Sequence, residues 1–149
     1  MSTRAHIHEE AFPVSPEDLF ALLITPSAIR GWWGAARVLV VPEEGGVWAA
    51  AWGDDEDAPD YLTTSTLEVF DPPRKLVFGN YQYRSKDGPL PFEADFVTTF
   101  EVEPHADGAS LRVTQDGFPA GPEGDDFYAG CDTGWRETFG GIRRFLGES

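Results

Sequence analysis

Apolar residues recur at helical spacing in the last part of the chain, over residues 125–146. One face of the predicted helix collects six of them: Phe127, Cys131, Trp135, Phe139, Ile142 and Leu146. Acidic residues at its start and basic residues near its end suit the helix dipole, and Gly147 is a typical stop. Burying this face would contribute on the order of 10 kcal/mol before entropy. We therefore predict a long helix that needs an apolar surface to lie on.

Two short helices are predicted earlier in the chain, each opened by a capping residue and a proline. Ser15 and Pro16 open the first, and Thr25 and Pro26 repeat the pattern for the second. The predicted helices span residues 16–24 and 26–31.

The remaining apolar patterns predict strands. A first strand is expected at residues 4–12. Alternating residues separated by turn sequences then predict six consecutive strands, at 38–41, 47–52, 61–70, 75–83, 92–102 and 109–115. Short connections require mostly antiparallel pairing. We predict an α+β fold in which a curved antiparallel sheet of about six or seven strands wraps around the C-terminal helix, with two short helices after the first strand.

Two histidines lie on one face of the first strand, His6 and His8. Two imidazoles without a nearby third ligand are insufficient for a metal site. We expect both side chains to face solvent, and we predict no metal.

Two glycines in the long helix and a pair of tryptophans elsewhere in the chain suggest a space beneath that helix. Gly130 and Gly134 lie inside it, where each glycine should cost ~1 kcal/mol relative to alanine. They indicate either close packing on the sheet or room for a ligand. Trp32 and Trp33 are too large for both rings to enter a small core, so one is expected to border an opening.

Bulk properties narrow the class of protein. The chain has 149 residues, the size of one domain (1–149), with 11 basic and 26 acidic residues and a net charge of −15. This charge disfavours binding to nucleic acid or insertion at anionic membranes. Cys131 is the single cysteine, which excludes an internal disulfide, and its apolar face indicates a buried thiol. Without a visible signal peptide or membrane-length apolar run, we expect a cytoplasmic protein.

Several short motifs occur in the order seen in a known superfamily. They are FPVSPEDLF at 12–20, WWG at 32–34, GG at 45–46, DPPRKL at 71–76, LRVTQDGF at 111–118 and GW at 134–135. In this order they resemble the START-like, birch-pollen-allergen-like (SRPBCC) superfamily, and within it homologues of the activator of the heat-shock chaperone ATPase. The resemblance implies a helix-grip fold whose cavity commonly takes apolar small molecules. Chaperone activators carry a second, N-terminal domain for which this chain has no room, so it resembles the stand-alone bacterial type.

No catalytic pattern is visible: we find no Cys–His or Ser–His–Asp arrangement and no phosphate loop. We therefore expect binding of a small hydrophobic molecule between sheet and helix, without a cofactor or catalytic residues. Gln82, Gln115 and Tyr81 are further polar candidates near the presumed cavity. The predicted ligand-binding residues are Trp33, Trp48, Trp52, Tyr61, Phe78, Asn80, Phe96, Thr98, Phe100, Gly134 and Trp135.

Two other functions fit the same fold. The acidic surface could meet a basic protein partner, as in a co-chaperone-like interaction module. Some members of the superfamily are cyclases or aromatases that shape a reactive chain within the cavity. The sequence is compatible with a monomer or a homodimer.

Overall fold

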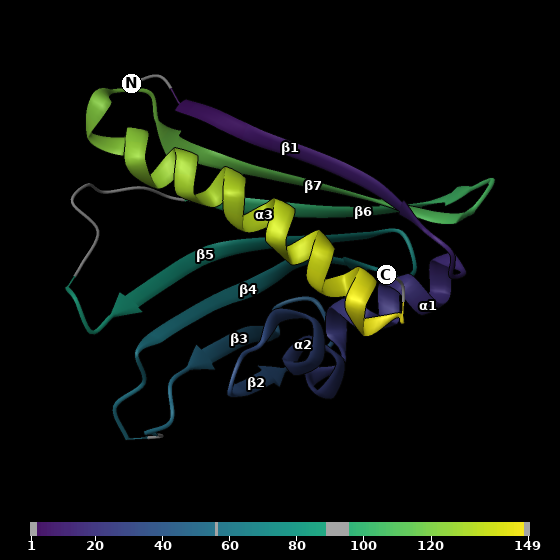
Figure 1. The fold of residues 1–149 in the computed structure, drawn as a ribbon, viewed down its shortest axis with the longest axis horizontal. Helices are drawn as coiled ribbons and strands as arrows, with labels where there is room; N and C mark the ends of the chain where they lie inside the picture. The colour runs from purple at the N-terminus through teal and green to yellow at the C-terminus, as the bar shows by residue number, and fades with distance from the viewer. Residues whose placement is uncertain (1–2, 56, 89–95, 148–149) are drawn as a thin grey trace.

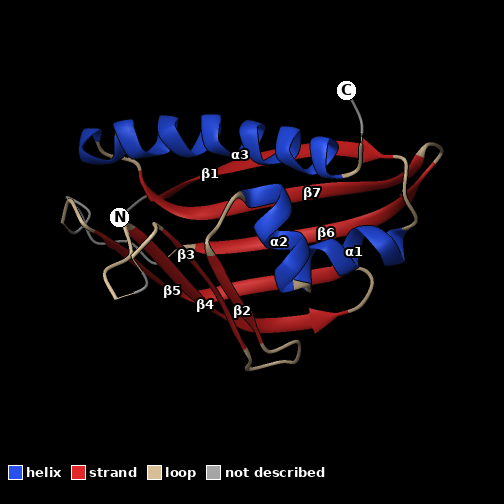
Figure 2. Cartoon of the chain, turned by 60° about the horizontal axis from the view of Figure 1, so that its bottom comes forward, coloured by secondary structure: helices blue, strands red, loops and turns tan. Residues whose placement is uncertain are grey.

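Seven antiparallel strands form one curved sheet, and three helices lie on the same face of it (Figures 1 and 2). The computed structural model describes residues 3–55, 57–88 and 96–147, to which these numbers apply. The helices are α1 (Pro16–Ile24), α2 (Pro26–Trp33) and α3 (Asp125–Phe145), with a short 3₁₀ turn at Pro122–Gly124. The strands are β1 (Thr3–Phe12), β2 (Arg37–Val40), β3 (Val47–Trp52), β4 (Tyr61–Asp71), β5 (Lys75–Ser85), β6 (Val97–His105) and β7 (Gly108–Pro119).

The strand order is β1-β7-β6-β5-β4-β3-β2, so the first strand pairs with the last. The register shifts in the β1–β7 and β4–β5 pairs, and such bulges bend a sheet and increase its twist. One of these shifts lies at Gly117, whose φ of 99° suits glycine. The curved sheet with a long C-terminal helix across it confirms the predicted helix-grip α+β fold.

The two short helices follow their predicted caps, with one difference. The Ser15 hydroxyl accepts a hydrogen bond from the Asp18 amide at 3.1 Å, as an N-cap should. Thr25 precedes α2, but its hydroxyl makes no cap bond there and donates to the Ala21 carbonyl at 2.6 Å. The prediction that the Thr25 side chain caps α2 is therefore wrong. Its hydroxyl instead donates to a carbonyl near the C-terminus of α1, where the last carbonyl groups lack partners within the helix.

Two tryptophans satisfy the next carbonyls at the same helix end. The indole nitrogen of Trp32 donates to Leu22 and that of Trp48 donates to Leu23, each at 2.9 Å. These bonds link α1 to α2 and to β3, and they fix the orientation of both indole rings.

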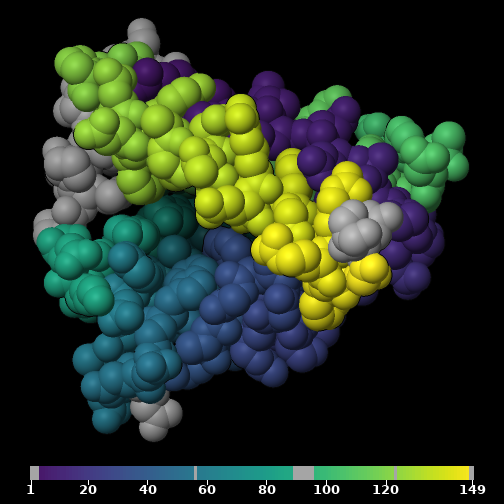
Figure 3. Space-filling model, viewed as in Figure 1, coloured from purple at the N-terminus to yellow at the C-terminus, as the bar shows by residue number. Residues whose placement is uncertain are grey.

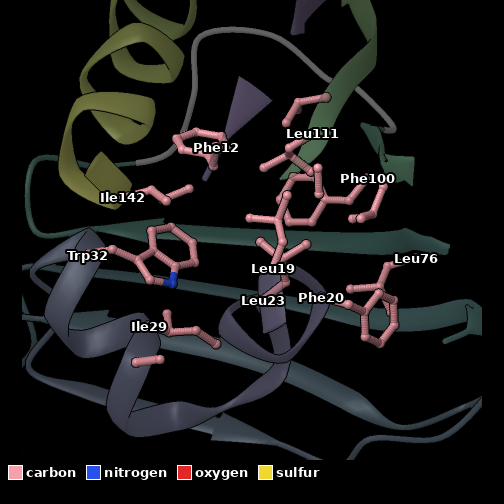
Figure 4. Packing of buried hydrophobic residues seen from close by; sticks show 14 of the residues in the cluster. Phe12, Leu19, Phe20, Leu23, Ile29, Trp32, Leu76, Phe100, Leu111 and Ile142 are labelled. Atoms are coloured by element: carbon pink, nitrogen blue, oxygen red, sulfur yellow. The ribbon is translucent and has the colours of Figure 1, made fainter. Parts of the chain in front are cut away.

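The hydrophobic core lies between the sheet and the helices (Figure 4). Fully buried residues come from every layer: Phe12, Leu19, Leu76, Leu111 and Ile142. Residues of β6 and β7 alternate as predicted, with Thr98, Phe100, Val102, Ala109, Leu111, Val113 and Gln115 buried. Residues 92–95, where we predicted the start of β6, lie outside the described part of the chain.

The residues of the long helix that are fully buried all lie in its C-terminal half. Phe139 and Ile142 are buried, whereas Phe127, Cys131 and Trp135 are half-buried. At Gly141 the helix touches α2 so closely that a Cβ atom would lie 2.2 Å from the Trp32 carbonyl oxygen. Close backbone packing therefore fixes this end of α3. Among the described residues, no helix is both long and apolar enough to cross a membrane.

Polar side chains join α3 to β1 near both ends of the helix. Arg4 pairs with Asp125 near the start of the helix, and Glu10 pairs with Arg143 at 2.9 Å near its end. These contacts hold the helix along the edge strand of the sheet.

The two histidines of β1 lie between these ion pairs. We predicted that both side chains would face solvent, but both are covered by α3. His6 is 5% exposed and stacks on Tyr128, while His8 lies against Asp132, with its Nε2 atom 3.3 Å from Oδ1. Burial lowers the pKa of His8 below its ordinary value, although Asp132 acts in the opposite direction. The prediction was wrong because the alternation of an edge strand does not reveal which of its faces a distant helix covers.

Replacing Gly141 by alanine tests the close contact of α2 and α3. The new methyl group would meet the Trp32 carbonyl oxygen, so the free energy of unfolding should fall by about 1–3 kcal/mol. Gly140→Ala is the matched control, because its nearest atom is Nη1 of Arg144 at 3.5 Å. There alanine should raise the free energy of unfolding by up to about 1 kcal/mol through helix propensity. Urea denaturation measures both, and equal stabilisation by the two changes would contradict the close approach.

Candidate functional site

A cavity of about 200 Å³ lies between the middle of α3, at residues 131–138, and the sheet. The space-filling view shows the molecule hollowed beneath α3, with teal strands of the sheet inside the hollow (Figure 3). None of the described residues that line the cavity carries a charge at neutral pH. They are Trp32, Trp33, Trp48, Thr63, Ser65, Phe78, Tyr81, Thr98, Phe100, Gln115, Cys131, Gly134, Trp135 and Thr138.

Aromatic rings form a continuous wall of this cavity. Trp33 and Trp48 have ring centroids 5.4 Å apart, and Trp48 continues to Phe78 at 5.0 Å. Phe78 meets Phe100 edge-on at 5.0 Å, and Phe100 meets Trp135 of α3 edge-on at 5.9 Å. The wall thus runs from α2 across the sheet to the long helix, with ring spacings typical of favourable aromatic pairs.

Two indole N–H groups of this wall, those of Trp48 and Trp135, and that of the neighbouring Trp32 have partners within the protein. Trp135 donates to the Gln115 side-chain oxygen at 2.6 Å, and Trp32 and Trp48 donate to the α1 carbonyls described above. Because these donors are used within the protein, the rings present mainly apolar surface to the cavity.

A few polar groups interrupt the apolar lining. Ser65 and Thr98 are buried side chains of β4 and β6. The Thr63 hydroxyl oxygen is buried and has no hydrogen-bond partner among the described residues. An unpaired buried hydroxyl is unfavourable, so Thr63 would gain from a polar ligand atom placed beside it.

Gly134 borders both the cavity and an outer hollow between α2 and α3. The hollow has a volume of about 430 Å³ and shares Trp32, Trp33, Gly134 and Thr138 with the cavity lining. A Cβ atom at Gly134 would have no heavy atom within 4 Å. Of the two interpretations of this glycine, open space therefore fits and close packing does not. The same test finds open space at Gly130, which lines neither cavity nor hollow.

The structure brings seven of the eleven predicted ligand-binding residues to the cavity: Trp33, Trp48, Phe78, Thr98, Phe100, Gly134 and Trp135. The other four lie elsewhere. Trp52 borders the outer hollow, with its ring 4.8 Å from Trp33. Phe96 is buried against Phe118, with ring centroids 4.9 Å apart. Tyr61 begins β4 and is 39% exposed.

Asn80 lies outside the cavity because β5 bulges at that point. Thr64 pairs with Gln82 but Thr66 pairs with Gly79, so two residues of β5, Asn80 and Tyr81, stand opposite one residue of β4. Asn80 has a φ of 50° and is exposed. Strict alternation placed Asn80 and Gln82 on the face of Phe78; the bulge turns Tyr81 to the cavity instead and leaves Gln82 exposed.

Sequence reasoning did not include five lining residues: Trp32, Thr63, Ser65, Cys131 and Thr138. Thr63 and Ser65 follow the period of two in β4, and β3 pairing sets Ser65 opposite Trp48. Once Trp48 was placed at the cavity, this period of two could have predicted Ser65 and Thr63 beside it.

The titratable groups of the lining are held in their neutral forms. Burial raises the pKa of Cys131 to about 12, and it raises the pKa of Tyr81 well above its ordinary value. The neutral thiol is a poor nucleophile, which argues against thiol chemistry in the cavity. The lining can therefore bind an uncharged apolar molecule without desolvating a charge.

Residues 13–147 match the family model described as activator of Hsp90 ATPase homolog 1-like protein. The chain belongs to this family. The match covers nearly the whole chain and confirms the resemblance seen in its motifs. No protein with curated annotation matches the chain in sequence.

Solved structures share the fold of this family member along its whole length. Protein MLL2253 from Mesorhizobium loti is 22% identical, covers 97% of each chain and superposes with a TM-score of 0.77. Mll3558 from Rhizobium loti is 19% identical over 97% of each chain, with a TM-score of 0.75. SA2116 from Staphylococcus aureus, a protein of unknown function, is 10% identical over 98% of this chain and 94% of that one, with a TM-score of 0.76. At these identities the likeness establishes the fold alone.

Proposed function

We propose that this protein binds a small, uncharged and largely apolar molecule in the cavity beneath α3. The observation that carries the proposal is the continuous aromatic wall from Trp33 to Trp135, which faces open space. Apolar pockets with a few placed polar groups are the usual form of small-molecule sites. A family whose members share this helix-and-sheet architecture agrees with such a role.

The size and shape of the cavity limit the ligand. Pockets for drug-sized ligands usually hold about 300–1,000 Å³, so a space of about 200 Å³ favours a molecule of one or two rings or a short chain. Flat ligands suit the wall best, because they can stack on Trp33 and Trp48 and meet the edges of Phe78 and Phe100.

Thr63 supplies a polar contact that would orient the ligand. Its side chain lines the same cavity as the aromatic rings, and its buried hydroxyl has no hydrogen-bond partner among the described residues. A ligand with one hydroxyl or carbonyl group at its end would satisfy it while the rest of the molecule stays among the rings. The outer hollow between α2 and α3 is the route by which such a molecule would enter.

Filling the cavity from α3 should abolish binding without unfolding the protein. Gly134→Leu places an apolar side chain in the open space and improves helix propensity, so the variant should fold. Ligand binding is measured by quenching of tryptophan fluorescence with 4-nitroanisole and 2-naphthol. Four of the five tryptophans line the cavity, so a bound ring should quench them strongly. We expect saturable quenching in the wild type and none in Gly134→Leu.

Gly130→Leu is the matched control for this experiment. It makes the same substitution one turn earlier, at an exposed position outside the cavity lining, and should bind as the wild type does. Equal binding by a folded Gly134→Leu variant, or no binding by the wild type to any member of the panel, would refute the proposal.

Removing the unpaired hydroxyl tests its role as a polar anchor. Thr63→Val should leave the free energy of unfolding unchanged or raise it by up to about 1 kcal/mol, because the hydroxyl has no hydrogen bond to lose among the described residues. Affinity for 2-naphthol should fall towards that for naphthalene, which has no hydroxyl group. Thr64→Val is the control, since the adjacent residue points to the other face of the sheet. If both valine variants keep the wild-type preference for 2-naphthol, Thr63 does not contact the ligand.

A further inference from the structure

A second polar cluster lies outside the cavity, where α3 covers the edge strand β1. His6 and His8 project from β1, and Asp132 projects from α3. The Asp132 Oδ1 atom is 3.6 Å from Nδ1 of His6 and 3.3 Å from Nε2 of His8. One donor atom from each residue lies within 4.8 Å of the other two. The third ligand that the sequence lacked near the histidines thus comes from a helix more than 120 residues away.

The hydrogen-bonding state of His6 leaves a lone pair directed at the carboxylate. Its Nε2 atom is 2.6 Å from the Tyr128 carbonyl oxygen, which can only accept, so Nε2 carries a proton. In the neutral ring Nδ1 is then an acceptor that faces another acceptor, Oδ1 of Asp132. Metal-binding histidines are typically held in this way, with the second ring nitrogen donating to a backbone carbonyl.

His8 supplies a second unsatisfied nitrogen at the same point. Its Nε2 atom is buried and has no hydrogen-bond partner among the described residues, although Asp132 lies close by. The other carboxylate oxygen of Asp132, Oδ2, contacts Arg136 at 3.2 Å. Arg136 therefore holds the carboxylate so that Oδ1 alone faces the two rings.

We propose that His6, His8 and Asp132 bind a divalent cation of the zinc class. Zinc bonds to nitrogen and oxygen of about 2.0–2.1 Å place neighbouring ligand atoms about 3.3 Å apart in a tetrahedron, close to the two observed separations. Two imidazoles and one carboxylate form a donor set suited to Zn²⁺ and to other late first-row divalent metals rather than to Ca²⁺ or Mg²⁺. Without a cation, the ring nitrogens of His6 and His8 face the Asp132 Oδ1 atom with no proton between them. A bound cation would accept electron pairs from all three atoms and so remove this repulsion.

The position of the cluster suits a metal that exchanges with solvent. The Asp132 side chain is 34% exposed, while His6 and His8 are 5% and 11% exposed. Solvent therefore reaches the carboxylate side and leaves a fourth coordination position for water. A bound cation would tie the N-terminal half of α3 to β1, beside the cavity wall formed by Trp135 and Gln115, since Gln115 pairs with His6 across the sheet.

Zinc titration of the tag-free protein tests the proposal. Calorimetry should show one Zn²⁺ per chain, and histidine NMR signals should shift for His6 and His8 but not for His105. His8→Gln and Asp132→Asn should each weaken binding at least about tenfold. His105→Gln is the matched control, because it removes the remaining histidine, which is exposed and lies at the end of β6. This control should bind Zn²⁺ as the wild type does.

Several results would overturn the proposal. They are the absence of stoichiometric Zn²⁺ binding by the wild type, equal loss of binding in His105→Gln, and unchanged binding in Asp132→Asn. Circular dichroism without metal checks that each variant is folded. If a variant fails to fold, the histidine signals of the wild type decide the outcome, because a shift confined to His105 would place the metal elsewhere. The readouts involve no cavity ligand, so the proposed binding function can fail without affecting them.

Discussion

The cavity exists because the two ends of α3 approach the rest of the protein differently, closely against α2 at one end and along the edge strand β1 at the other. At Gly141 the helix backbone touches the carbonyl of Trp32, and Phe139 and Ile142 are buried in the core on either side. Towards its start the helix is held at the edge by polar contacts with β1 and by the rings of Phe127 and Tyr128 on Phe118, and its apolar side chains are only half-buried. A straight helix fixed closely at one end and at the rim at the other leaves a space over the curved sheet, and this space is the aromatic cavity.

The same arrangement explains why the cavity can stay open. Large rings surround it, but hydrogen bonds within the protein set their positions: the indole nitrogens of Trp32 and Trp48 donate to carbonyls at the end of α1, and that of Trp135 donates to Gln115. The helix end needs these donors because its carbonyls lack helical partners. Collapse of the cavity would break those bonds. Stability of the first helix and shape of the site are thus linked through two tryptophans.

Local sequence signals predicted most of the fold. Caps, prolines and apolar periodicity located all three helices to within a few residues, and alternation located the strands. Structural features that depend on contacts between distant parts of the chain were not predicted. The bulge in β5 exchanged Asn80 for Tyr81 at the cavity, and the pairing of β1 with β7 under α3 buried His6 and His8. Neither feature has a local pattern, because each is decided by which strand or helix lies opposite.

Hydrogen exchange along α3, followed by NMR, tests the central claim most directly. If the helix is buried in the core only in its second half, amides of residues 138–142 should exchange through global unfolding, whereas those of residues 129–134, above the cavity, should exchange faster through local opening. Saturation of the cavity with 2-naphthol should slow exchange selectively in the first half. Uniform protection along the whole helix, with no selective response to the aromatic molecule, would contradict a helix that is held away from the sheet over a binding cavity.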